Sequence, residues 1–195
     1  SDIRFKNPEK SSRELDGLYD RGYFHGTNSG YPASGYRDSH PQWTPWLDLI
    51  GTIKPSGMLI DLGCAYGYLV QESRQRGYQA IGLDISSHAL AQEPELAPWR
   101  GRANLERLPL QSRSADIVTL FDVLEHLHNP KKALAEAVRI LKPEGLLVGA
   151  TPDPIYFEGN EETHFTERPP SFWIKAIEDL GLTVHFRFSV EPYNF

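Results

Sequence analysis

The sequence predicts an α/β fold built on a doubly wound, mostly parallel sheet. From about residue 44 onward, short apolar runs alternate with segments of helical periodicity, which is typical of strands joined by crossover helices. One apolar run, Met58–Leu62, leads into a tight turn between Gly63 and Gly67, and a second run ends in Asp84. Acids and glycines at these points indicate that the carboxyl ends of two strands open into a nucleotide-sized crevice.

Helices are predicted where apolar residues recur at a spacing of three or four. A first helix ends before a Pro-Ser-Gly turn, a second ends at Gly77, and a short third one, capped by Ser86 or Ser87, is interrupted by prolines. A fourth begins at Pro130 with a clear apolar face, and Gly181 ends a fifth. The predicted helices are 44–53, 68–77, a short segment after 86, 130–141 and 171–180.

Strands are predicted where short apolar or alternating runs lie between these helices. The predicted strands are 58–62, 79–83, 102–105, 117–121, 146–150 and 182–190.

Residues 1–42 differ from the rest of the chain, because they combine glycine, serine and tyrosine with weak periodicity. A short helix is predicted over 12–18. Disordered segments are usually poor in aromatic residues, so the tyrosines and phenylalanines favour a folded flap over a flexible tail. We therefore divide the chain into a flap or lid, 1–42, that covers the ligand site, and a ligand-binding domain, 43–195. Tyr23 and His25 of the flap are candidate substrate contacts.

The composition disfavours several classes of function. With 195 residues and a net charge of −6, the chain has the size of one domain and lacks the basic character that binding of duplex nucleic acid requires. Its single cysteine, Cys64, rules out an internal disulfide and fits a reducing compartment. No apolar run reaches the roughly 20 residues that span a bilayer, and the polar start does not resemble a signal peptide. We expect a cytoplasmic protein without membrane contact.

Two acidic residues define the chemistry expected at the crevice. Asp61 lies at the tip of the first strand, where a cationic group of a ligand can pair with it. Asp84 ends the second strand, and an acid there can accept hydrogen bonds from both ribose hydroxyls of a nucleoside. Together they favour an adenosine with a positively charged amino-acid tail. The Gly63-x-x-x-Gly67 spacing differs from Gly-x-Gly-x-x-Gly, so a dinucleotide-dependent oxidoreductase is the weaker alternative.

The stretch Asp61-Leu62-Gly63-Cys64-Ala65-Tyr66-Gly67 resembles the Asp/Glu-x-Gly-x-x-x-Gly motif of class I S-adenosylmethionine-dependent methyltransferases. The resemblance covers roughly residues 44–190, with further motifs in the family's order. They are Asp84, Leu108-Pro109, Asp116–Val118, Leu124–Leu127 and Leu141–Gly145. The resemblance implies a Rossmann-like class I methyltransferase fold, with S-adenosylmethionine as cofactor and S-adenosylhomocysteine as product.

The resemblance also implies roles around the crevice: Asp61 would hold the cofactor's amino group and Asp84 its ribose. Ile85 would pack on the adenine, while Ser86 would bind the ribose or cap the next helix. Where the family often has aspartate, Asn104 can still accept a hydrogen bond from adenine through its amide oxygen. The remaining predicted cofactor-binding residues are Gly63, Cys64 and Ala65 along the methionine tail, Gly67 and Tyr68 at the start of the next helix, Leu105 through its N–H, Phe121 through its carbonyl, and Asp122 as a site carboxylate or a helix cap.

Methyl transfer from a sulfonium is an in-line displacement, so the protein must mainly align the acceptor, and a hydroxyl acceptor also needs a base. The loop after the fifth strand faces the acceptor in this architecture, so His164 is the first candidate base and His126 the second. Tyr156 and Phe157 of that loop are candidate substrate contacts. No metal site is expected, because the histidines and carboxylates lack ligand spacing.

The sequence therefore predicts methyl transfer to an O or N atom of a small molecule, of secondary-metabolite or sugar type by analogy. One alternative is a binding-only relative or a non-methyltransferase user of the same cofactor. A nucleic-acid or protein methyltransferase is disfavoured by the negative charge. Because the chain ends shortly after the predicted strand 182–190, we expect the last strand of the family's sheet to be short or missing. A second copy of the chain, as in a homodimer, or a further segment would then cover this sheet edge.

Overall fold

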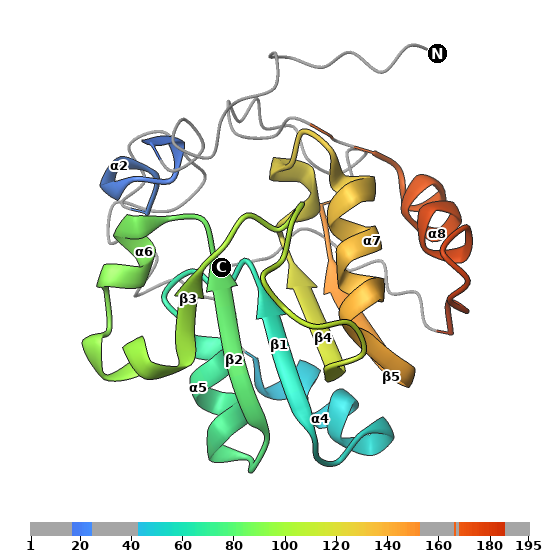
Figure 1. Ribbon diagram of the computed structural model, residues 1–195, viewed down its shortest axis with the longest axis horizontal. Helices are drawn as coiled ribbons and strands as arrows, with labels where there is room; N and C mark the ends of the chain where they lie inside the picture. The colour runs from blue at the N-terminus through green and yellow to red at the C-terminus, as the bar shows by residue number, and fades with distance from the viewer. Residues whose placement is uncertain (1–16, 25–42, 153–165, 167, 186–195) are drawn as a thin grey trace.

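The computed structural model describes residues 17–24, 43–152, 166 and 168–185, and a twisted sheet lies at its centre (Figure 1). In these residues the sheet has five strands in the order β3-β2-β1-β4-β5, and every neighbouring pair is parallel. The strands are β1 Met58–Leu62, β2 Gln79–Asp84, β3 Arg100–Arg102, β4 Ala115–Phe121 and β5 Leu141–Ala150. The predicted doubly wound α/β fold is confirmed, because each parallel step requires a crossover connection.

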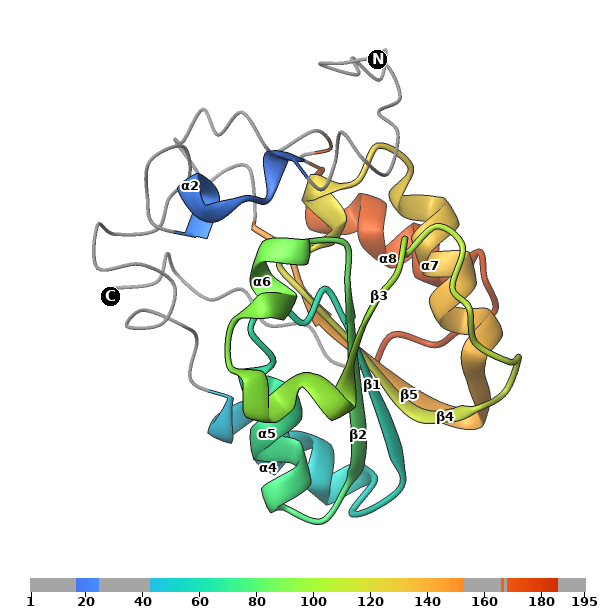
Figure 2. The same ribbon diagram turned by 60° about the vertical axis from the view of Figure 1, so that its left-hand side comes forward.

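Helices cover both faces of the sheet. Consecutive residues of one strand point to opposite faces, so Leu59 and Ile60 of β1 belong to two different hydrophobic clusters. Figure 2 shows α4 and α5 on one face and α7 and α8 on the other. The helices are α2 Arg21–Phe24, α4 Thr44–Ile53, α5 Tyr68–Gln75, α6 Ser87–Ala91, α7 Pro130–Ile140 and α8 Pro170–Glu178, and the 3-10 helices are η1 Pro94–Trp99 and η2 Leu124–His126.

Several element boundaries differ from the sequence prediction. The third strand covers 100–102 rather than 102–105, because the side-chain oxygen of Asn104 accepts a hydrogen bond from Glu106 N at 2.9 Å and forms a turn there. Residues 182–185 are not in a strand. Leu182 N instead donates a hydrogen bond of 3.4 Å back to Ile177 O, near the end of α8.

The other differences concern the fifth strand, the first helix and the sixth strand. The fifth strand begins earlier than predicted, at Leu141, with a register shift against β4. Gly17 and Leu18 are helical, but the rest of the predicted helix 12–18 lies outside the described residues. The same holds for residues 186–190 of the predicted sixth strand.

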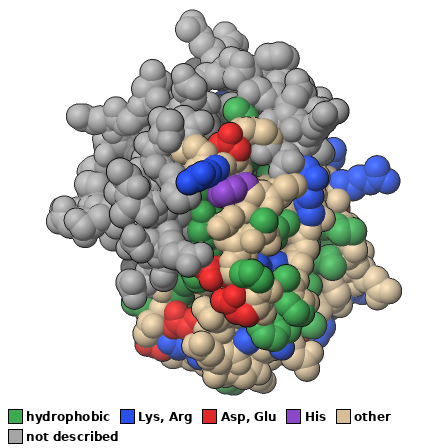
Figure 3. Space-filling model, turned by 90° about the vertical axis from the view of Figure 1, so that its left-hand side faces the viewer, with side chains coloured by type: hydrophobic (Ala, Val, Ile, Leu, Met, Phe, Trp, Pro, Cys, Tyr) green, Lys and Arg blue, Asp and Glu red, His purple; other side chains and the backbone are tan. Residues whose placement is uncertain are grey.

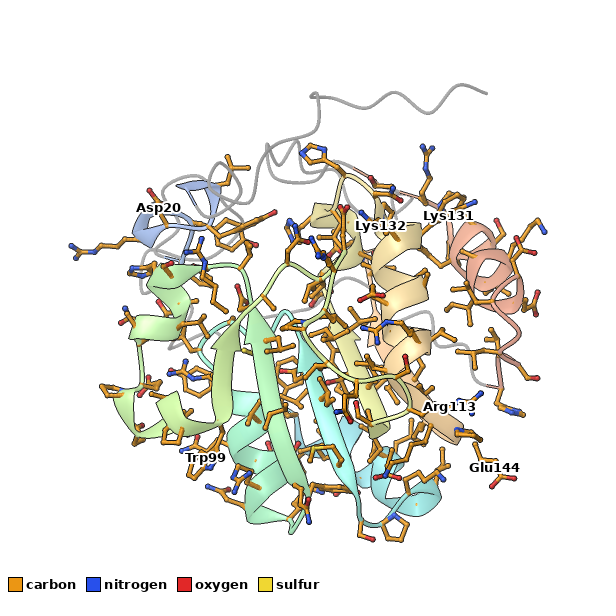
Figure 4. All side chains as sticks on the ribbon, viewed as in Figure 1. Asp20, Trp99, Arg113, Lys131, Lys132 and Glu144 are labelled. Atoms are coloured by element: carbon orange, nitrogen blue, oxygen red, sulfur yellow. The ribbon has the colours of Figure 1, made fainter. Side chains whose placement is uncertain are left out.

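The carboxyl ends of the strands lie together at one edge of the sheet. Helix α2 lies beside α6 at this edge in both ribbon views (Figures 1 and 2). Lys131 and Lys132 mark the same side at the start of α7, whereas Arg113 and Glu144 lie at the opposite end (Figure 4). The longest described helix, α7, has 11 residues, and none in this part of the chain is long and apolar enough to cross a bilayer.

Candidate active site

The turn after β1 carries the glycine motif at the carboxyl edge of the sheet. Gly63 and Gly67 both have left-handed backbone, with φ values of 82° and 91°. Ala65 between them also has a positive φ of 46°, which the sequence did not predict. Gly63 N and Cys64 N both donate to Leu83 O, at 2.7 and 3.2 Å, so the turn is fixed to the end of β2.

The structure gives a packing reason for glycine at both of these positions. A Cβ on Gly63 would lie 2.3 Å from a methyl carbon of Val123, and a Cβ on Gly67 would lie 2.5 Å from Cδ of Arg100. Protein side chains therefore occupy the space that a Cβ would need at both positions. Cys64 is buried and burial raises the pKa of its thiol, which agrees with a packing role.

Asp61 lies one residue before the end of β1 rather than at the tip, and its side chain is only 5% exposed. Its carboxylate accepts a hydrogen bond of 2.7 Å from the hydroxyl of Thr119. Burial, and to a smaller extent the nearby Asp84 carboxylate, raise the pKa of Asp61 from 3.8 to about 7, although the Thr119 hydrogen bond opposes this shift. No cationic side chain among the described residues pairs with this acid.

Asp84 ends β2 and is 9% exposed. Its two carboxylate oxygens accept hydrogen bonds of 2.8 Å from Ala65 N and Ser86 N. Burial raises the pKa of Asp84, and the bonded N–H groups and the charge of Arg100 oppose that shift. The acid therefore links the glycine turn after β1 to the segment after β2.

Ser86 caps α6, which is one of its two predicted roles; the other is a contact with the ribose. Its hydroxyl oxygen accepts a hydrogen bond of 3.0 Å from Ala89 N and donates one to Tyr19 O. Ile85, the predicted adenine contact, lies between Asp84 and Ser86 in the sequence.

The segment after β3 is held by two side chains of α7. Glu136 accepts a hydrogen bond of 2.7 Å from Leu108 N, and Arg139 donates to Leu108 O and Leu110 O at 3.2 and 2.9 Å. Asn104 accepts from Glu106 N as described, so its side chain is fixed at the start of this segment. Leu105 is buried in the core beneath this segment.

The turn after β4 completes the edge. Phe121 packs against Trp43 and Trp46, with ring centroids 5.2 and 5.0 Å away. Asp122 has a positive φ of 51°, and its N–H donates to Ala150 O at 2.9 Å. It does not cap the next helix, because Val123 is the residue that precedes η2 and no side chain caps it. That alternative is therefore wrong.

His126 lies under residues of the amino-terminal segment and is 8% exposed. The rings of Tyr19 and Tyr23 meet it edge-on, with centroids 5.8 and 6.1 Å away. Its Nε2 lies 3.9 Å from Oε1 of Glu125. The other acceptor-side candidates lie outside the described residues; they are His25, Tyr156, Phe157 and His164.

Sequence reasoning missed three residues that shape the site. Thr119 is a polar residue within the apolar strand β4 and pairs in register with Asp61, so its isolation in that strand was a usable signal. Arg100 and Val123 gave no such signal, because they reach the glycine turn from distant parts of the chain. In the described part of the chain, no three His, Cys, Asp or Glu side chains are placed to hold a metal ion.

The parallel sheet with buried carboxylates at the ends of β1 and β2 defines a class I, S-adenosylmethionine-dependent methyltransferase fold. Residues 60–149 match the family model described as a methyltransferase domain. This match covers just under half of the chain, and it confirms the predicted resemblance to S-adenosylmethionine-dependent methyltransferases.

Curated relatives match this domain over part of their length. A probable S-adenosylmethionine-dependent methyltransferase of Mycolicibacterium smegmatis is 32% identical over 109 residues, which are 54% of this chain and 42% of that protein. A ubiquinone biosynthesis O-methyltransferase of Alkalilimnicola ehrlichii is 31% identical over 48% of this chain and 40% of that protein. The matched region thus spans about two fifths of the length of these two relatives.

Solved structures share the fold. A putative methyltransferase in complex with the Haloferax volcanii Trm112 methyltransferase activator aligns with a TM-score of 0.68 and 21% identity, over 89% of this chain and 78% of that chain. An S-adenosylmethionine-dependent methyltransferase from Mesorhizobium loti aligns with a TM-score of 0.61 and 20% identity, over 72% of this chain and 82% of that chain.

Proposed function

We propose that the chain transfers a methyl group from S-adenosylmethionine to an O or N atom of a small-molecule acceptor. The observation that carries the proposal is the pair of buried carboxylates, Asp61 and Asp84, at the carboxyl ends of two adjacent parallel strands. A buried acid whose pKa is raised gains free energy when a cation approaches. The pair therefore fits a ligand with an ammonium group and a ribose.

Each acid has a separate task in this proposal. Asp61, without a cationic partner among the described residues, would bind the ammonium of the methionine tail. Asp84 is held in place by Ala65 N and Ser86 N and retains lone pairs for the ribose hydroxyls. The cofactor supplies an activated methyl group on a sulfonium sulfur.

The remaining predicted contacts surround these two acids. Asn104 and Leu105 would bind the adenine edge, Ile85 its face, and Phe121 and Asp122 would line the amino-acid tail. Phe121 ends β4, and the other four residues follow β2, β3 or β4 at the same edge of the sheet. Ligands of open α/β sheets bind outside this edge, which supports the assignment.

The acceptor would approach from the side of His126. A hydroxyl acceptor must lose a proton, and His126 is the candidate base that the structure describes, with Glu125 close enough to stabilise its protonated form. His164 remains a candidate base from sequence. A ubiquinone biosynthesis O-methyltransferase and a malonyl-[acyl-carrier protein] O-methyltransferase among the relatives support an oxygen acceptor.

We propose that residues 1–42 form a lid over the site. Tyr23 and Phe24 belong to a hydrophobic cluster with Tyr66 of the glycine turn and Ala89 of α6. Tyr19 reaches both sides of the edge, through its O to Ser86 and its ring to His126. A closed lid would exclude water from the reacting atoms.

The distribution of charge bears on which kind of acceptor the site takes. Figure 3 shows the side of α6 and β3, where the described Lys and Arg side chains stand among acidic and hydrophobic ones without forming a continuous stripe. This pattern favours a small molecule over duplex nucleic acid. At the other edge, β5 pairs with β4, and no other strand of the described residues pairs with it. We propose that a further segment or a second copy of the chain covers this edge.

A second candidate function keeps the cofactor but not the transfer. A solved structure named the [4+2]-cyclase SpnF aligns with a TM-score of 0.55 and 20% identity, over 70% of this chain and 56% of that chain. Proteins with this fold are therefore not all named as methyltransferases. A binding-only role, or a non-methyltransferase use of the same cofactor, is the alternative.

Calorimetric titration with S-adenosylmethionine, S-adenosylhomocysteine and NAD separates these functions in a first step. We expect both adenosyl ligands to bind and NAD not to bind. An acceptor screen read by mass then looks for a product 14 Da heavier, a gain of one CH₂ unit, together with S-adenosylhomocysteine, as methyl transfer requires. Binding without turnover on any quinol, acyl or sugar acceptor favours the alternative, and binding of NAD alone contradicts both.

A further inference from the structure

Arg100 begins β3, directly after Trp99 of η1, which is labelled in Figure 4. It pairs in register with Gly82 of β2, two residues before Asp84. The side chain leaves the sheet toward the glycine turn and passes Gly67 so closely that a Cβ there would lie 2.5 Å from its Cδ.

The guanidinium of Arg100 binds carbonyl groups of two separate segments. Its Nη1 donates to Tyr66 O at 2.6 Å, within the glycine turn after β1, and to Ala89 O of α6 at 3.3 Å. Its Nη2 donates to Leu90 O, Gln92 O and Glu93 O in and after α6. One side chain thus joins the segment after β1 to the segment after β2.

The charge of Arg100 is not used in an ion pair among the described residues. A structural ion pair therefore does not explain why an arginine stands here, since its partners are neutral backbone carbonyls. The planar shape of the guanidinium explains the arginine, because only this group presents several N–H donors in fixed directions. A lysine has one nitrogen and cannot reach both sets of carbonyls in the same way.

We propose that Arg100 is a positioning residue of the cofactor site, which sets the distance between the glycine turn that follows Asp61 and the helix that follows Asp84. This inference rests on the proposed function, because it assigns Arg100 to cofactor binding. Two observations carry it independently: the carbonyl contacts on both segments, and the missing Cβ at Gly67 that lets the side chain pass.

The test compares Arg100→Lys and Arg100→Met with the unchanged chain and with Arg76→Met. Arg76 is a fair control, because it is a half-buried arginine at the end of α5 that binds Asp48 and Glu72 at the opposite end of the molecule. Calorimetry with S-adenosylhomocysteine, well below the melting temperature of each variant, gives the dissociation constant. Hydrogen exchange without ligand gives the protection of segments 64–67 and 86–93.

We expect Arg100→Met to raise the dissociation constant at least about tenfold and Arg100→Lys to raise it less, whereas Arg76→Met leaves it within about twofold. We also expect faster exchange in both segments together, and not in α7, for the Arg100 variants only. Unchanged affinity and unchanged exchange in Arg100→Lys overturn the inference, even if Arg100→Met does not fold. If the unchanged chain does not bind S-adenosylhomocysteine, the proposed function fails, and exchange alone decides whether Arg100 joins the segments.

Discussion

The hydroxyl of Thr119 donates a 2.7 Å hydrogen bond to the carboxylate of Asp61, across the pairing of β4 with β1. Both side chains are buried, and the hydroxyl is the partner that holds this carboxylate in place. The bond stabilises the charged form of an acid whose surroundings otherwise favour the neutral form. Thr119 therefore sets the pH range over which the site attracts a cation.

Thr119→Val should move the pH dependence of ligand binding. Valine has a similar shape but no donor, so the pKa of Asp61 should rise further above its value of about 7. At pH 7 a larger fraction of Asp61 is then neutral, and affinity for S-adenosylhomocysteine should fall, with recovery at pH 9. Titrations at several pH values measure this shift. An unchanged pH profile would show that Asp61 does not contact the bound ammonium.

Asp61→Asn should stabilise the protein at neutral and alkaline pH while weakening ligand binding. The pKa of Asp61 is about 7 in the folded state against an ordinary 3.8, so the folded state binds this proton more tightly. The contribution of Asp61 to the unfolding free energy therefore falls as the pH rises from about 4 to about 7, by on the order of 4 kcal/mol.

Denaturant unfolding of both proteins at pH 4, 6 and 8 measures this effect. The difference in unfolding free energy, Asp61→Asn minus the parent, should grow with pH across this range. A constant difference would contradict the raised pKa, whatever happens to ligand affinity.

Gly67→Ala should be more harmful than Gly77→Ala, although both glycines have nearly the same backbone. Their φ values are 91° and 92°, so the backbone strain of an alanine is matched at about 1 kcal/mol. A Cβ at Gly77 meets open space, whereas at Gly67 it meets Arg100. We expect Gly67→Ala to cost about 2 kcal/mol more in unfolding free energy, since overpacking adds to the strain.

The double variant Gly67→Ala with Arg100→Ala provides the control for this comparison. If the arginine causes the clash, removal of its side chain should make the combined loss smaller than the sum of the single losses. Strict additivity would mean that Gly67 is required for its backbone conformation alone.

His126→Phe should reduce turnover without a matching loss of cofactor affinity. Phenylalanine retains a ring for the edge-on contacts of Tyr19 and Tyr23 but has no titratable nitrogen. For a hydroxyl acceptor we expect a fall of about 100-fold or more in kcat and the loss of one ionisation from the pH–rate profile. His185→Gln, at an exposed position, serves as the control. A normal rate for His126→Phe would return the role of base to His164.

The sheet and the two acids were predictable because they depend on local sequence. Met58–Leu62 is buried along nearly its whole length, and the acids fall where the apolar runs end. The third strand was misplaced by two residues because the turn at Asn104 depends on a side-chain hydrogen bond. The contact of Tyr19 with His126 joins residues 107 positions apart, and that of Arg100 with Tyr66 joins residues 34 positions apart. Local sequence periodicity cannot predict such long-range contacts.

The raised pKa of Asp61 has a thermodynamic consequence for the act of binding itself. Because the pKa lies near 7, part of the molecules carry a proton on this carboxyl at neutral pH. An arriving ammonium would drive that proton into solution, so each binding event would release a fraction of a proton to the buffer. The measured heat of binding would then differ between buffers of low and high ionisation enthalpy, such as phosphate and Tris, and the difference would count the protons released.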